Sequence, residues 1–334
     1  MKQFRKLLWP FSVLYDGITQ LRNWTYKSGI SKSESFDIPT LVLGNLSTGG
    51  TGKTPATEFF LEHLPGRKAV VSRGYGRQTK GVREVHVNDS PLQVGDEPLQ
   101  IKTKFPGTPF FVAEKRVDGI TALLKKHPDT ELILLDDAYQ HLSLKARCYV
   151  LLTTWQQPFS GDLVLPAGNL RESKKGKKRA SIILVTKCPA DLNVADAEAL
   201  KKKLKPLPQQ QVFFSTINYA APLQMIGTKP LEKEIAVLTG IAKPQPFLDT
   251  LGEKYRIQQH FKFRDHYNFT ATEVAEIKQF LRVHQLPLLT TEKDWMRLKD
   301  FFSEQNAISV FVMPIKMEVL FGEKSNLLQS IKIL

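Results

Sequence analysis

The stretch GNLSTGGTGKTP (44–55) decides the fold of this chain. It follows an apolar run, IPTLVLGN (38–45), which we expect to form a buried strand, and it precedes a predicted helix from Pro55 to about Leu64. A glycine-rich loop between a strand and a helix N-terminus lets backbone N–H groups surround phosphate oxygens, and the helix dipole favours the same negative charge. The stretch therefore predicts a loop that binds the phosphates of a nucleotide.

Within this loop, a lysine and a threonine stand where such loops place their functional side chains. We expect the Lys53 ammonium to reach the β- and γ-phosphates, and the Thr54 hydroxyl to bind Mg²⁺. Ser47 stands where the common pattern G-x-x-x-x-G-K-[ST] begins with glycine, and Gly49 and Gly50 supply the flexibility instead. The predicted nucleotide-binding residues are Ser47, Thr48, Gly49, Gly50, Thr51, Gly52, Lys53 and Thr54.

A second signal lies in LILLDD (132–137), where a hydrophobic strand ends in Asp136 and Asp137. Mg²⁺ prefers one or two carboxylates, completed by water and phosphate oxygens. Two aspartates at a strand end, downstream of a phosphate loop, favour this use. We therefore predict a metal site formed by Thr54, Asp136 and Asp137, in an enzyme that uses a nucleotide together with Mg²⁺.

Further apolar runs alternate with helical patterns along the chain. Strands are expected at 68–76, at 83–87, at the start of 110–127, and at 131–140, 146–154 and 180–187. This alternation predicts an α/β fold with a P-loop NTPase-type, mostly parallel sheet covered by helices. A strand at 211–219 is expected to cross to a second, smaller α/β lobe. The predicted parts are an N-terminal amphipathic helix (1–34), a P-loop core (35–215) and the smaller C-terminal lobe (216–334).

The N-terminal segment carries an amphipathic pattern. Its apolar residues recur at helical spacing, and they are Phe4, Leu7, Phe11, Leu14, Ile18 and Leu21, accompanied by Trp9 and Trp24. A basic amphipathic helix of this composition either lies in a membrane interface or packs its apolar face on its own domain. Pro10 predicts that the regular helix starts or kinks there.

Composition excludes several classes of protein. Apolar residues make up 42% and charged residues 24%, which excludes wholesale disorder. Cys148 and Cys188 are too few for a disulfide framework, and this cysteine usage fits a reducing compartment. The net charge of +14 favours encounter with anions without choosing among nucleic acid, anionic lipid and phosphorylated substrates. The lysine-rich stretch RESKKGKKR (171–179) fits either a solvated face or an anion-binding one.

Three further motifs carry groups capable of chemistry. Asp96 in VGDEP (94–98) fits a solvated turn better than a proton acceptor when judged from the residues alone. His266 in RDHYNF (264–269) is either structural or a partner of Asp96 across a cleft. The candidate phosphate-binding arginines, each otherwise a surface ion pair, are Arg73, Arg77, Arg116 and Arg171.

The ordered set of motifs resembles the tetraacyldisaccharide 4′-kinase family, the lipid A 4′-kinases of bacteria with an outer membrane. The resemblance runs from WPFSVLYDGITQLRN (9–23) to TTEKDWMRL (290–298) and includes the phosphate loop, SRGYGR (72–77), VGDEP, LDDAYQH (135–141), PAGNLRE (166–172) and DHYNF (265–269). It implies transfer of the γ-phosphoryl group of ATP to the 4′-hydroxyl of a tetraacylated glucosamine disaccharide 1-phosphate. The product would be lipid IVA, in lipid A biosynthesis.

The resemblance also implies roles for particular positions. Asp96 acts as the base, paired with His266. The residues implied to lie near the transferred phosphate or the acceptor are Tyr75, Arg116, Arg171 and Glu172, with Asn45 in the same pocket. The family fold implied is a core and a smaller lobe that close on the ligand. The chain departs from the family at Ala138-Tyr139, where Gly-Phe is common, and in its lysine-rich segment after PAGNLRE.

An acceptor with four acyl chains stays in a bilayer, so we favour membrane contact by the N-terminal helix. We expect a monomer that binds the lipid substrate at the cytoplasmic face of the inner membrane, as a peripheral protein, and that binds no nucleic acid. Two rival functions are a membrane-cycling ATPase and a nucleic-acid-binding protein. Dimerising ATPases with a similar loop carry a lysine where this chain has Thr48, and no nucleic-acid-reading module is evident.

Overall fold

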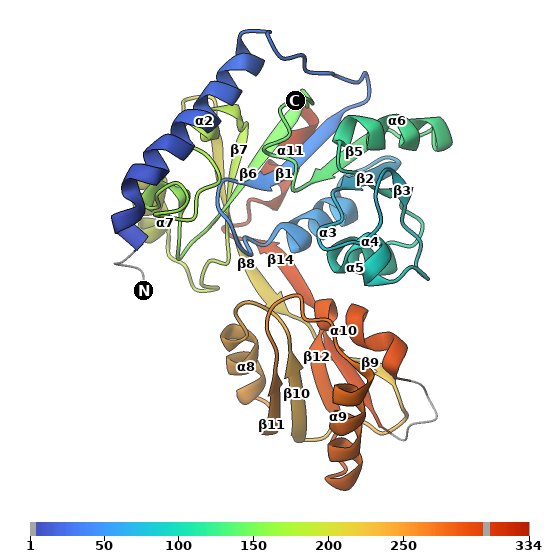
Figure 1. Cartoon of the computed structure of the whole chain (residues 1–334). Helices are drawn as coiled ribbons and strands as arrows, with labels where there is room; N and C mark the ends of the chain where they lie inside the picture. Colours follow the sequence, from blue (N-terminus) through green and yellow to red (C-terminus); the bar gives the residue numbers. More distant parts are fainter. Residues whose placement is uncertain (1–4, 303–307, 334) are drawn as a thin grey trace.

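The computed structural model describes residues 5–302 and 308–333, so Phe4 of the amphipathic pattern lies outside the described residues. Figure 1 shows a larger lobe and a smaller lobe connected by a pair of strands. Within the described ranges, the larger lobe holds a nine-stranded sheet of order β14-β8-β7-β6-β1-β5-β2-β4-β3. The smaller lobe holds a five-stranded sheet of order β11-β10-β12-β13-β9.

The larger sheet is parallel except at its two edges. The parallel strands are β8 (Gln211–Tyr219), β7 (Ile182–Thr186), β6 (Cys148–Thr154), β1 (Thr40–Asn45), β5 (Leu132–Asp136), β2 (Lys68–Ser72) and β4 (Phe110–Val112). The antiparallel edge strands are β14 (Ile315–Val319) and β3 (Arg83–Glu84). Helices cover both faces, which explains why the central strands are almost continuously apolar. The predicted mostly parallel α/β fold is confirmed.

Alternate residues of each central strand pack against different helices. Leu41 and Leu43 share a core with α3 (Lys53–His63), α5 (Asp96–Lys104) and α11 (Lys324–Ile333). Val42 faces the other way, toward α6 (Arg116–Lys126) and α7 (Val194–Leu204). A short helix, α4 (Pro91–Val94), leads into α5. This period-two alternation seats the phosphate loop and α3 on one face of the sheet.

The smaller lobe repeats the same architecture on a reduced scale. Its parallel strands are β10 (Glu234–Thr239), β11 (Arg256–Lys262), β12 (Leu288–Thr291) and β13 (Val310–Met313), and β9 (Leu223–Ile226) is its antiparallel edge. Its helices are α8 (Gln245–Gly252), α9 (Ala271–Val283) and α10 (Glu292–Leu298). Phe247 and Leu251 of α8 cover one face, and Val274 of α9 and Trp295 of α10 cover the other.

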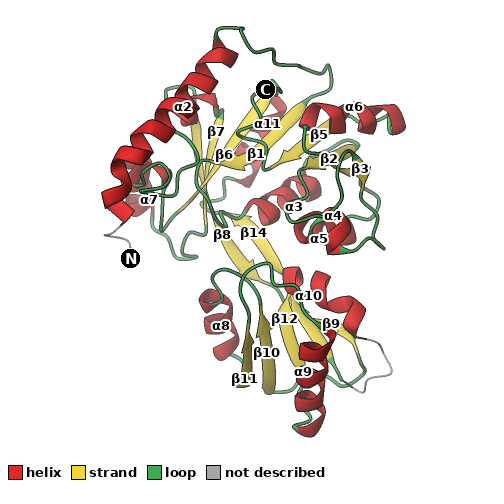
Figure 2. Cartoon of the chain, in the orientation of Figure 1, coloured by secondary structure: helices red, strands yellow, loops and turns green. Residues whose placement is uncertain are grey.

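Strands β8 and β14 connect the two lobes. β8 begins beside β7, and from Ser215 onward it pairs antiparallel with β14. Figure 2 shows this pair running from the larger sheet toward the smaller lobe. The predicted crossing strand at 211–219 is therefore present as β8. The segment 216–334 also contains β14 and α11, which pack with the larger lobe, and the division into domains stays a prediction.

Helix α2 (Trp9–Lys27) lies along the outer side of the larger lobe (Figure 1). Its apolar stripe points away from the protein, because each of its large members is more than half exposed; these are Trp9, Phe11, Leu14, Ile18, Leu21 and Trp24. Polar side chains hold it in place instead. Ser12 accepts a hydrogen bond from the Ala167 amide at 2.9 Å, and Asn23 donates to Glu172 at 3.2 Å.

Pro10 stands in the first turn of α2, where a missing N–H leaves no hydrogen bond unmade, so the helix starts there rather than kinking. Among the helices that the structure describes, none combines the length and the apolar character needed to cross a bilayer.

A buried ionic cluster ties three helices together across the two lobes. The Lys104 ammonium on α5 lies 2.7 Å from Glu58 Oε2 on α3 and 2.6 Å from Glu292 Oε1 on α10. Gln100 donates to Glu58 Oε1 at 2.9 Å. Two carboxylates share one ammonium here. Burial, opposed by Lys104 and reinforced by Glu292, raises the pKa of Glu58 to about 7.

We predict that Glu58→Gln makes stability less dependent on pH. Folded Glu58 retains a proton that the unfolded chain releases between its ordinary pKa of 4.5 and about 7. The free energy of unfolding therefore falls as pH rises through this window, by about 3 kcal/mol for this group. Urea unfolding at pH ~5 and pH ~8 should show a larger loss in the wild type than in Glu58→Gln.

The matched control is Glu62→Gln, which changes an exposed glutamate on the same helix and should keep the wild-type pH dependence. Equal pH slopes in wild type and Glu58→Gln would contradict the assignment.

Candidate active site

The phosphate loop leaves the C-terminal end of β1 and is braced from two sides. Gly49 (φ +105°) and Gly52 (φ +80°) adopt the left-handed backbone region that favours glycine. The Thr48 amide donates to the Asn169 carbonyl at 2.7 Å, and the Thr186 hydroxyl donates to the Thr51 carbonyl at 2.7 Å. The glycines thus permit the turn, and the neighbouring segments hold it in place.

Asn45 belongs to this bracing. It is fully buried at the end of β1, and its side-chain amide donates to the Ser47 carbonyl at 2.8 Å. Gln140 in turn donates to the Asn45 carbonyl at 2.9 Å. Asn45 therefore supports the loop by bonding to its backbone. The sequence resemblance places Asn45 in the pocket beside this loop.

The aspartate pair lies beside the loop because β1 and β5 are neighbouring parallel strands, with Leu43 opposite Asp136. The Lys53 ammonium is 3.6 Å from Asp137 Oδ1. Thr57, one turn into α3, donates to Asp136 Oδ1 at 3.4 Å. The predicted loop and the predicted metal ligands thus lie together at the C-terminal ends of β1 and β5.

The two aspartates have opposite ionisation tendencies. Burial, reinforced by Glu97, raises the pKa of Asp136 to about 7, although Lys53 opposes the shift. Burial also acts on Asp137, but Lys53 and Arg171 outweigh it and hold the pKa of Asp137 below its ordinary value. A divalent cation beside Asp136 would supply the positive charge that this buried carboxyl lacks.

The donor set fits magnesium rather than a metal held entirely by protein. No group of three or more His, Cys, Asp or Glu side chains placed to hold a metal occurs in the parts of the chain that the structure describes. Two carboxylates and the Thr54 hydroxyl leave the remaining positions to phosphate oxygens and water, which is the coordination that Mg²⁺ favours.

Arg116, which the sequence resemblance implies to lie near the transferred phosphate or the acceptor, contacts the backbone of the aspartate pair. Its side chain is fully buried, and burial lowers its pKa to about 10. It donates to the backbone carbonyls of Ala113 at 2.8 Å, Asp136 at 3.1 Å and Asp137 at 3.3 Å. Arg116 thus supports the turn that carries the aspartate pair, on which Asp137 has a left-handed φ of +47°.

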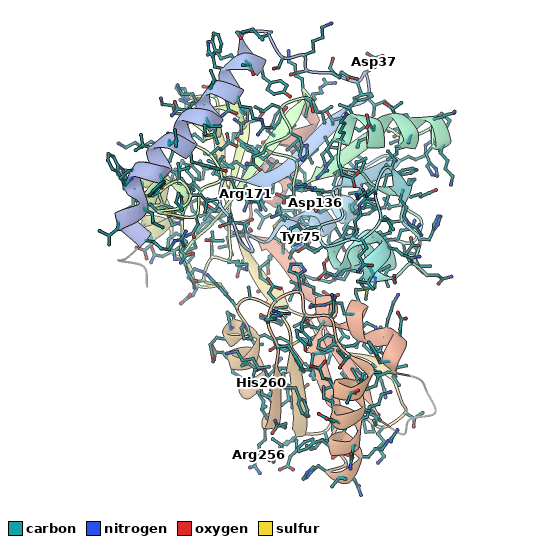
Figure 3. All side chains as sticks on the ribbon, viewed as in Figure 1. Asp37, Tyr75, Asp136, Arg171, Arg256 and His260 are labelled. Atoms are coloured by element: carbon teal, nitrogen blue, oxygen red, sulfur yellow. The ribbon has the colours of Figure 1, made fainter. Side chains whose placement is uncertain are left out.

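A pocket of about 380 Å³ opens in front of the aspartates. Its lining combines side chains of α2 with side chains that surround the aspartate pair. The lining residues are Tyr15, Thr19, Arg22, Asn23, Ser72, Arg73, Tyr75, Glu97, Pro98, Asp136, Asp137, Gln140, His141, Arg171 and Glu172. Figure 3 shows Tyr75, Asp136 and Arg171 close to one another on the side of the larger lobe that faces the smaller one.

Arg171 and Glu172 occupy one wall of this pocket. Arg171 Nη1 donates to both carboxylate oxygens of Asp137, at 3.1 and 3.2 Å. Glu172 is 3% exposed and accepts from Arg179 at 2.6 Å and from Gln140 at 3.0 Å. Arg171 therefore faces the site as a cation. Glu172 instead pairs with Arg179 and Gln140 and so holds this wall of the pocket in place.

The other two arginines of the sequence motifs, Arg73 and Arg77, also differ in whether they face the pocket. Arg73 is exposed and lines the pocket, whereas Arg77 forms an ion pair with Glu114 at 2.5 Å. Arg77 thus follows the ion-pair alternative, but its own side chain is 3% exposed, so only Glu114 lies at the surface.

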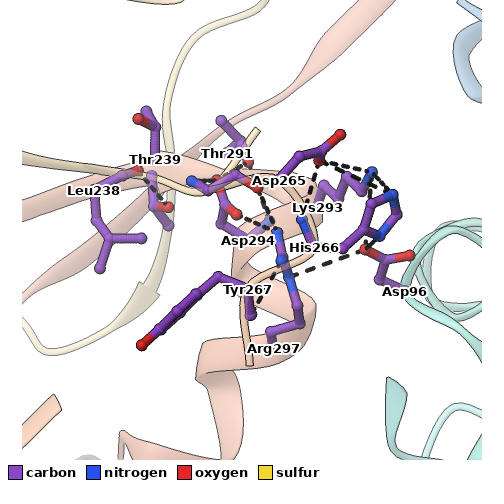
Figure 4. Close-up of polar contacts among 12 residues, drawn as sticks. Asp96, Leu238, Thr239, Asp265, His266, Tyr267, Thr291, Lys293, Asp294 and Arg297 are labelled. Atoms are coloured by element: carbon purple, nitrogen blue, oxygen red, sulfur yellow. Dashed lines mark hydrogen bonds and ion pairs between the residues drawn. The ribbon is translucent and has the colours of Figure 1, made fainter. Parts of the chain in front are cut away.

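Asp96 is the first residue of α5 and is 5% exposed, so the expectation of a solvated turn is wrong. Gly95, at a left-handed φ of +95°, ends α4 and begins α5, and this sharp junction turns the carboxylate inward. His266 from the smaller lobe reaches it, with Nδ1 3.0 Å from Asp96 Oδ2 (Figure 4). The structure thus joins the two residues that the sequence resemblance paired.

The charges around this pair favour the ionised carboxylate. Burial opposes ionisation, but His266, Lys293 and Arg297 outweigh it and lower the pKa of Asp96. Contact with Asp96 raises the pKa of His266 against the effect of its own burial. The exposed ring of Tyr75 meets the His266 ring edge-on, with centroids 5.3 Å apart.

Residue-by-residue reasoning from the sequence missed Lys293, Glu97, Gln140 and Thr57. Lys293 lies in TTEKD, Glu97 in VGDEP and Gln140 in LDDAYQH, so the motifs already quoted contained three of them. Thr57 stands one helical turn after Lys53-Thr54, and that spacing alone was a weak signal.

A family model described as tetraacyldisaccharide-1-P 4′-kinase matches residues 4–332. The chain belongs to this family. The resemblance seen in the sequence motifs is confirmed, and so is the enzyme class, a kinase. A tetraacyldisaccharide 4′-kinase of Flavobacterium johnsoniae is 39% identical over 99% of this chain and 98% of its own. One from Bacteroides fragilis is 38% identical over 98% of this chain and 93% of its own.

A solved structure of the same family shares the fold. The LpxK of Aquifex aeolicus, whose crystal structure is described as in complex with ATP, superposes with a TM-score of 0.77. It is 26% identical, and the similarity covers 99% of both chains. Both lobes of this tetraacyldisaccharide 4′-kinase family member therefore have counterparts in the Aquifex protein.

We predict that Arg116→Met destabilises the protein by about 3 kcal/mol or more, because three buried carbonyls lose their donor. Urea unfolding measures the loss. Arg67→Met is the control: Arg67 is mostly exposed and pairs with Asp129 and Glu131 at the surface, so the change should cost under about 1 kcal/mol. Similar midpoints for the two variants would refute a structural role for Arg116.

Proposed function

We propose that this protein transfers the γ-phosphoryl group of ATP to the 4′-hydroxyl of a tetraacylated glucosamine disaccharide 1-phosphate. The product is lipid IVA, the 1,4′-bisphosphate of lipid A biosynthesis. Family membership over nearly the whole chain supports this reaction. The observation that carries it is the shared pocket, in which side chains of the apolar helix α2 and the aspartate pair beside the phosphate loop line the same cavity.

At the nucleotide end, the loop from Ser47 to Thr54 surrounds the triphosphate with backbone N–H groups, and Lys53 contacts the β- and γ-phosphates. Thr54, Asp136 and Asp137 would hold Mg²⁺, which would offset the negative charge of the phosphate oxygens. Arg171, already paired with Asp137, adds a second cation on the pocket side. Asn45, Arg116 and Glu172 hold these groups in position.

At the acceptor end, Asp96 removes the proton of the 4′-hydroxyl as its oxygen bonds to the γ-phosphorus. The bond from that phosphorus to the β–γ bridging oxygen breaks, and ADP leaves. The neighbouring cations keep Asp96 ionised near neutral pH. A weak base suffices, because the transition state of phosphoryl transfer is loose and demands little of its base until late. His266 orients the carboxylate from the smaller lobe.

Transfer of label tests the reaction directly. Purified protein with γ-labelled ATP, Mg²⁺ and detergent-solubilised tetraacyl disaccharide 1-phosphate should place label in the lipid fraction. We expect Asp96→Asn to lower kcat by about 100-fold or more, with little change in KM for ATP, because a general base acts only in the chemical step. Asp118→Asn, which changes an exposed aspartate of α6, should retain full activity.

Steady ATP hydrolysis without lipid, and no label in the lipid, would support a membrane-cycling ATPase instead. Near-normal turnover of Asp96→Asn would reject the assigned base but not the reaction.

We further propose that α2 docks this protein, as a peripheral monomer, on the cytoplasmic face of the inner membrane. Its exposed Trp, Phe, Leu and Ile side chains suit the boundary between head groups and acyl chains. Residues 22–23 of the same helix line the pocket. The acceptor then reaches Asp96 while its acyl chains remain beside the bilayer.

We predict that Leu14→Ser combined with Ile18→Ser weakens binding to anionic vesicles by about 100-fold, since each buried aliphatic side chain contributes about 1.5–3 kcal/mol. Co-sedimentation measures the binding. The matched control combines Leu223→Ser with Val283→Ser, two aliphatic residues of the smaller lobe that are also more than half exposed. Turnover of detergent-solubilised acceptor should stay normal in both. Unchanged vesicle binding by the α2 variant would exclude this docking surface.

A further inference from the structure

The motif TTEKD (290–294) enters the reaction proposed above only through the charge of Lys293 near Asp96, although residues 291, 293 and 294 lie beside the pair of Asp96 and His266 (Figure 4). The motif spans the end of β12 and the start of α10. The Thr291 hydroxyl accepts from the Asp294 amide at 3.1 Å and donates to its carboxylate at 2.7 Å, which caps the helix. The cap sets the direction in which the first turn of α10 presents its side chains.

Two residues of α10 fix the loop that carries His266. The fully buried Asp294 carboxylate accepts from the Gly240 amide at 2.9 Å. Arg297 pairs with Asp294 and donates to the carbonyls of Gly240 and Tyr267, at 3.1 Å each. The end of β10, the start of α10 and the loop at 264–267 therefore form one unit. His266 adopts its left-handed φ of +55° inside this unit.

Lys293 is the member of the motif that touches His266. Its ammonium lies 3.1 Å from His266 Nε2 and 3.8 Å from Asp96 Oδ2. The same ammonium is 3.4 Å from Glu97 and 3.5 Å from Asp265. These carboxylates outweigh burial and raise the pKa of Lys293, so it remains a cation at neutral pH.

An ammonium group offers only donors, so a ring nitrogen that bonds to it must accept. When the ring is neutral and Nε2 accepts from Lys293, its single proton therefore lies on Nδ1. That atom is the one 3.0 Å from Asp96 Oδ2. The other groups facing the ring are the Tyr75 ring and Asp265, whose Oδ1 is 3.9 Å from Nε2.

We infer that Lys293 is a positioning residue that occupies His266 Nε2 and so keeps the single proton of the neutral ring on Nδ1, the ring nitrogen 3.0 Å from Asp96 Oδ2. The inference rests on the proposed role of Asp96 as the base. Asp96 Oδ1 accepts from the Glu97 amide at 2.9 Å, and Arg297 Nε lies 4.0 Å from Oδ2. With His266 held as a donor, the carboxylate keeps one orientation and remains an acceptor for the hydroxyl proton. Lys293 thus links docking of the smaller lobe to the state of the base.

The first test reads the tautomer without turnover. Protein labelled with ¹⁵N-histidine, with His266→Asn used to assign the signal, should show a protonated Nδ1 and an unprotonated Nε2 in the neutral ring. Lys293→Met removes the cation beside Nε2, so this nitrogen should take up a second proton at higher pH than in the wild type, giving a ring protonated on both nitrogens. Lys293→Arg restores a donor-only cation and should return the wild-type signals.

The second test is kinetic. Lys293→Met should lower kcat by about 10- to 100-fold through misorientation of the base, with little change in KM for ATP. Removing a cation near Asp96 raises the pKa of that carboxyl, so the acid limb of the pH profile of kcat should move to higher pH. Lys316→Met, which changes an exposed lysine of β14, should alter neither the tautomer nor the profile.

An Nε2–H tautomer in the wild type, or an unchanged titration of His266 in Lys293→Met, would overturn the inference. If Lys293→Met does not fold, as judged by thermal unfolding, the wild-type and Lys293→Arg spectra still decide. Failure of label transfer to lipid, with the expected tautomers, would reject the proposed function while leaving the positioning of His266 intact.

Discussion

The parallel pairing of β1 with β5 is the constraint on which the rest of the structure depends. It brings the phosphate loop, which leaves β1, beside the aspartates that end β5, so that Lys53 lies 3.6 Å from Asp137. Carboxylates gathered and buried in this way are unstable without compensation. Arg116 supplies part of this compensation by donating to the Asp136 carbonyl, and Arg171 supplies part by pairing with the Asp137 carboxylate on the pocket side. The remaining charge at Asp136 matches a bound divalent cation and the phosphates that accompany it.

Charged groups of both lobes meet around the base, beside an apolar core cluster to which both lobes contribute. Asp96 from the larger lobe meets His266, Lys293 and Arg297 from the smaller lobe. Farther along α5, Lys104 joins Glu58 and Glu292 across the same interface. Helix α5 therefore bears the catalytic carboxylate at one end and an ionic anchor at the other. Both contacts orient α10 against α5, and the second also includes Glu58 of α3.

Helix α2 exposes an apolar surface, in contrast to the charged groups that meet between the lobes. Its polar side chains bond to the segment at 166–172 and leave its apolar stripe free of the protein core. Because the same segment also provides Arg171 beside Asp137, the apolar surface and the phosphoryl-transfer site are connected through a few residues. A lipid acceptor requires this proximity, since its hydroxyl must leave the interface without its acyl chains entering water.

Local sequence patterns determined much of this protein. The glycines and Lys53 of the loop, the apolar run before Asp136 and the helical spacing of the N-terminal stripe depend on neighbours in the chain, and each formed the expected element. The ordered motifs also indicated the family. They did not show that Asp96 is buried, because its burial follows from the turn at Gly95 and from contact with a lobe about 170 residues away in sequence.

Tertiary structure alone decided the remaining features. Arg116 and Arg171 look alike in sequence, yet one supports backbone carbonyls in the core and the other faces the pocket. Ionic partners such as Lys104 with Glu292, and Lys293 with His266, come from separate elements whose distance no local pattern encodes. The direction of the α2 stripe was likewise open, because an amphipathic pattern specifies an apolar face but not what covers it. Long-range packing sets these outcomes, and it depends on the whole folded chain.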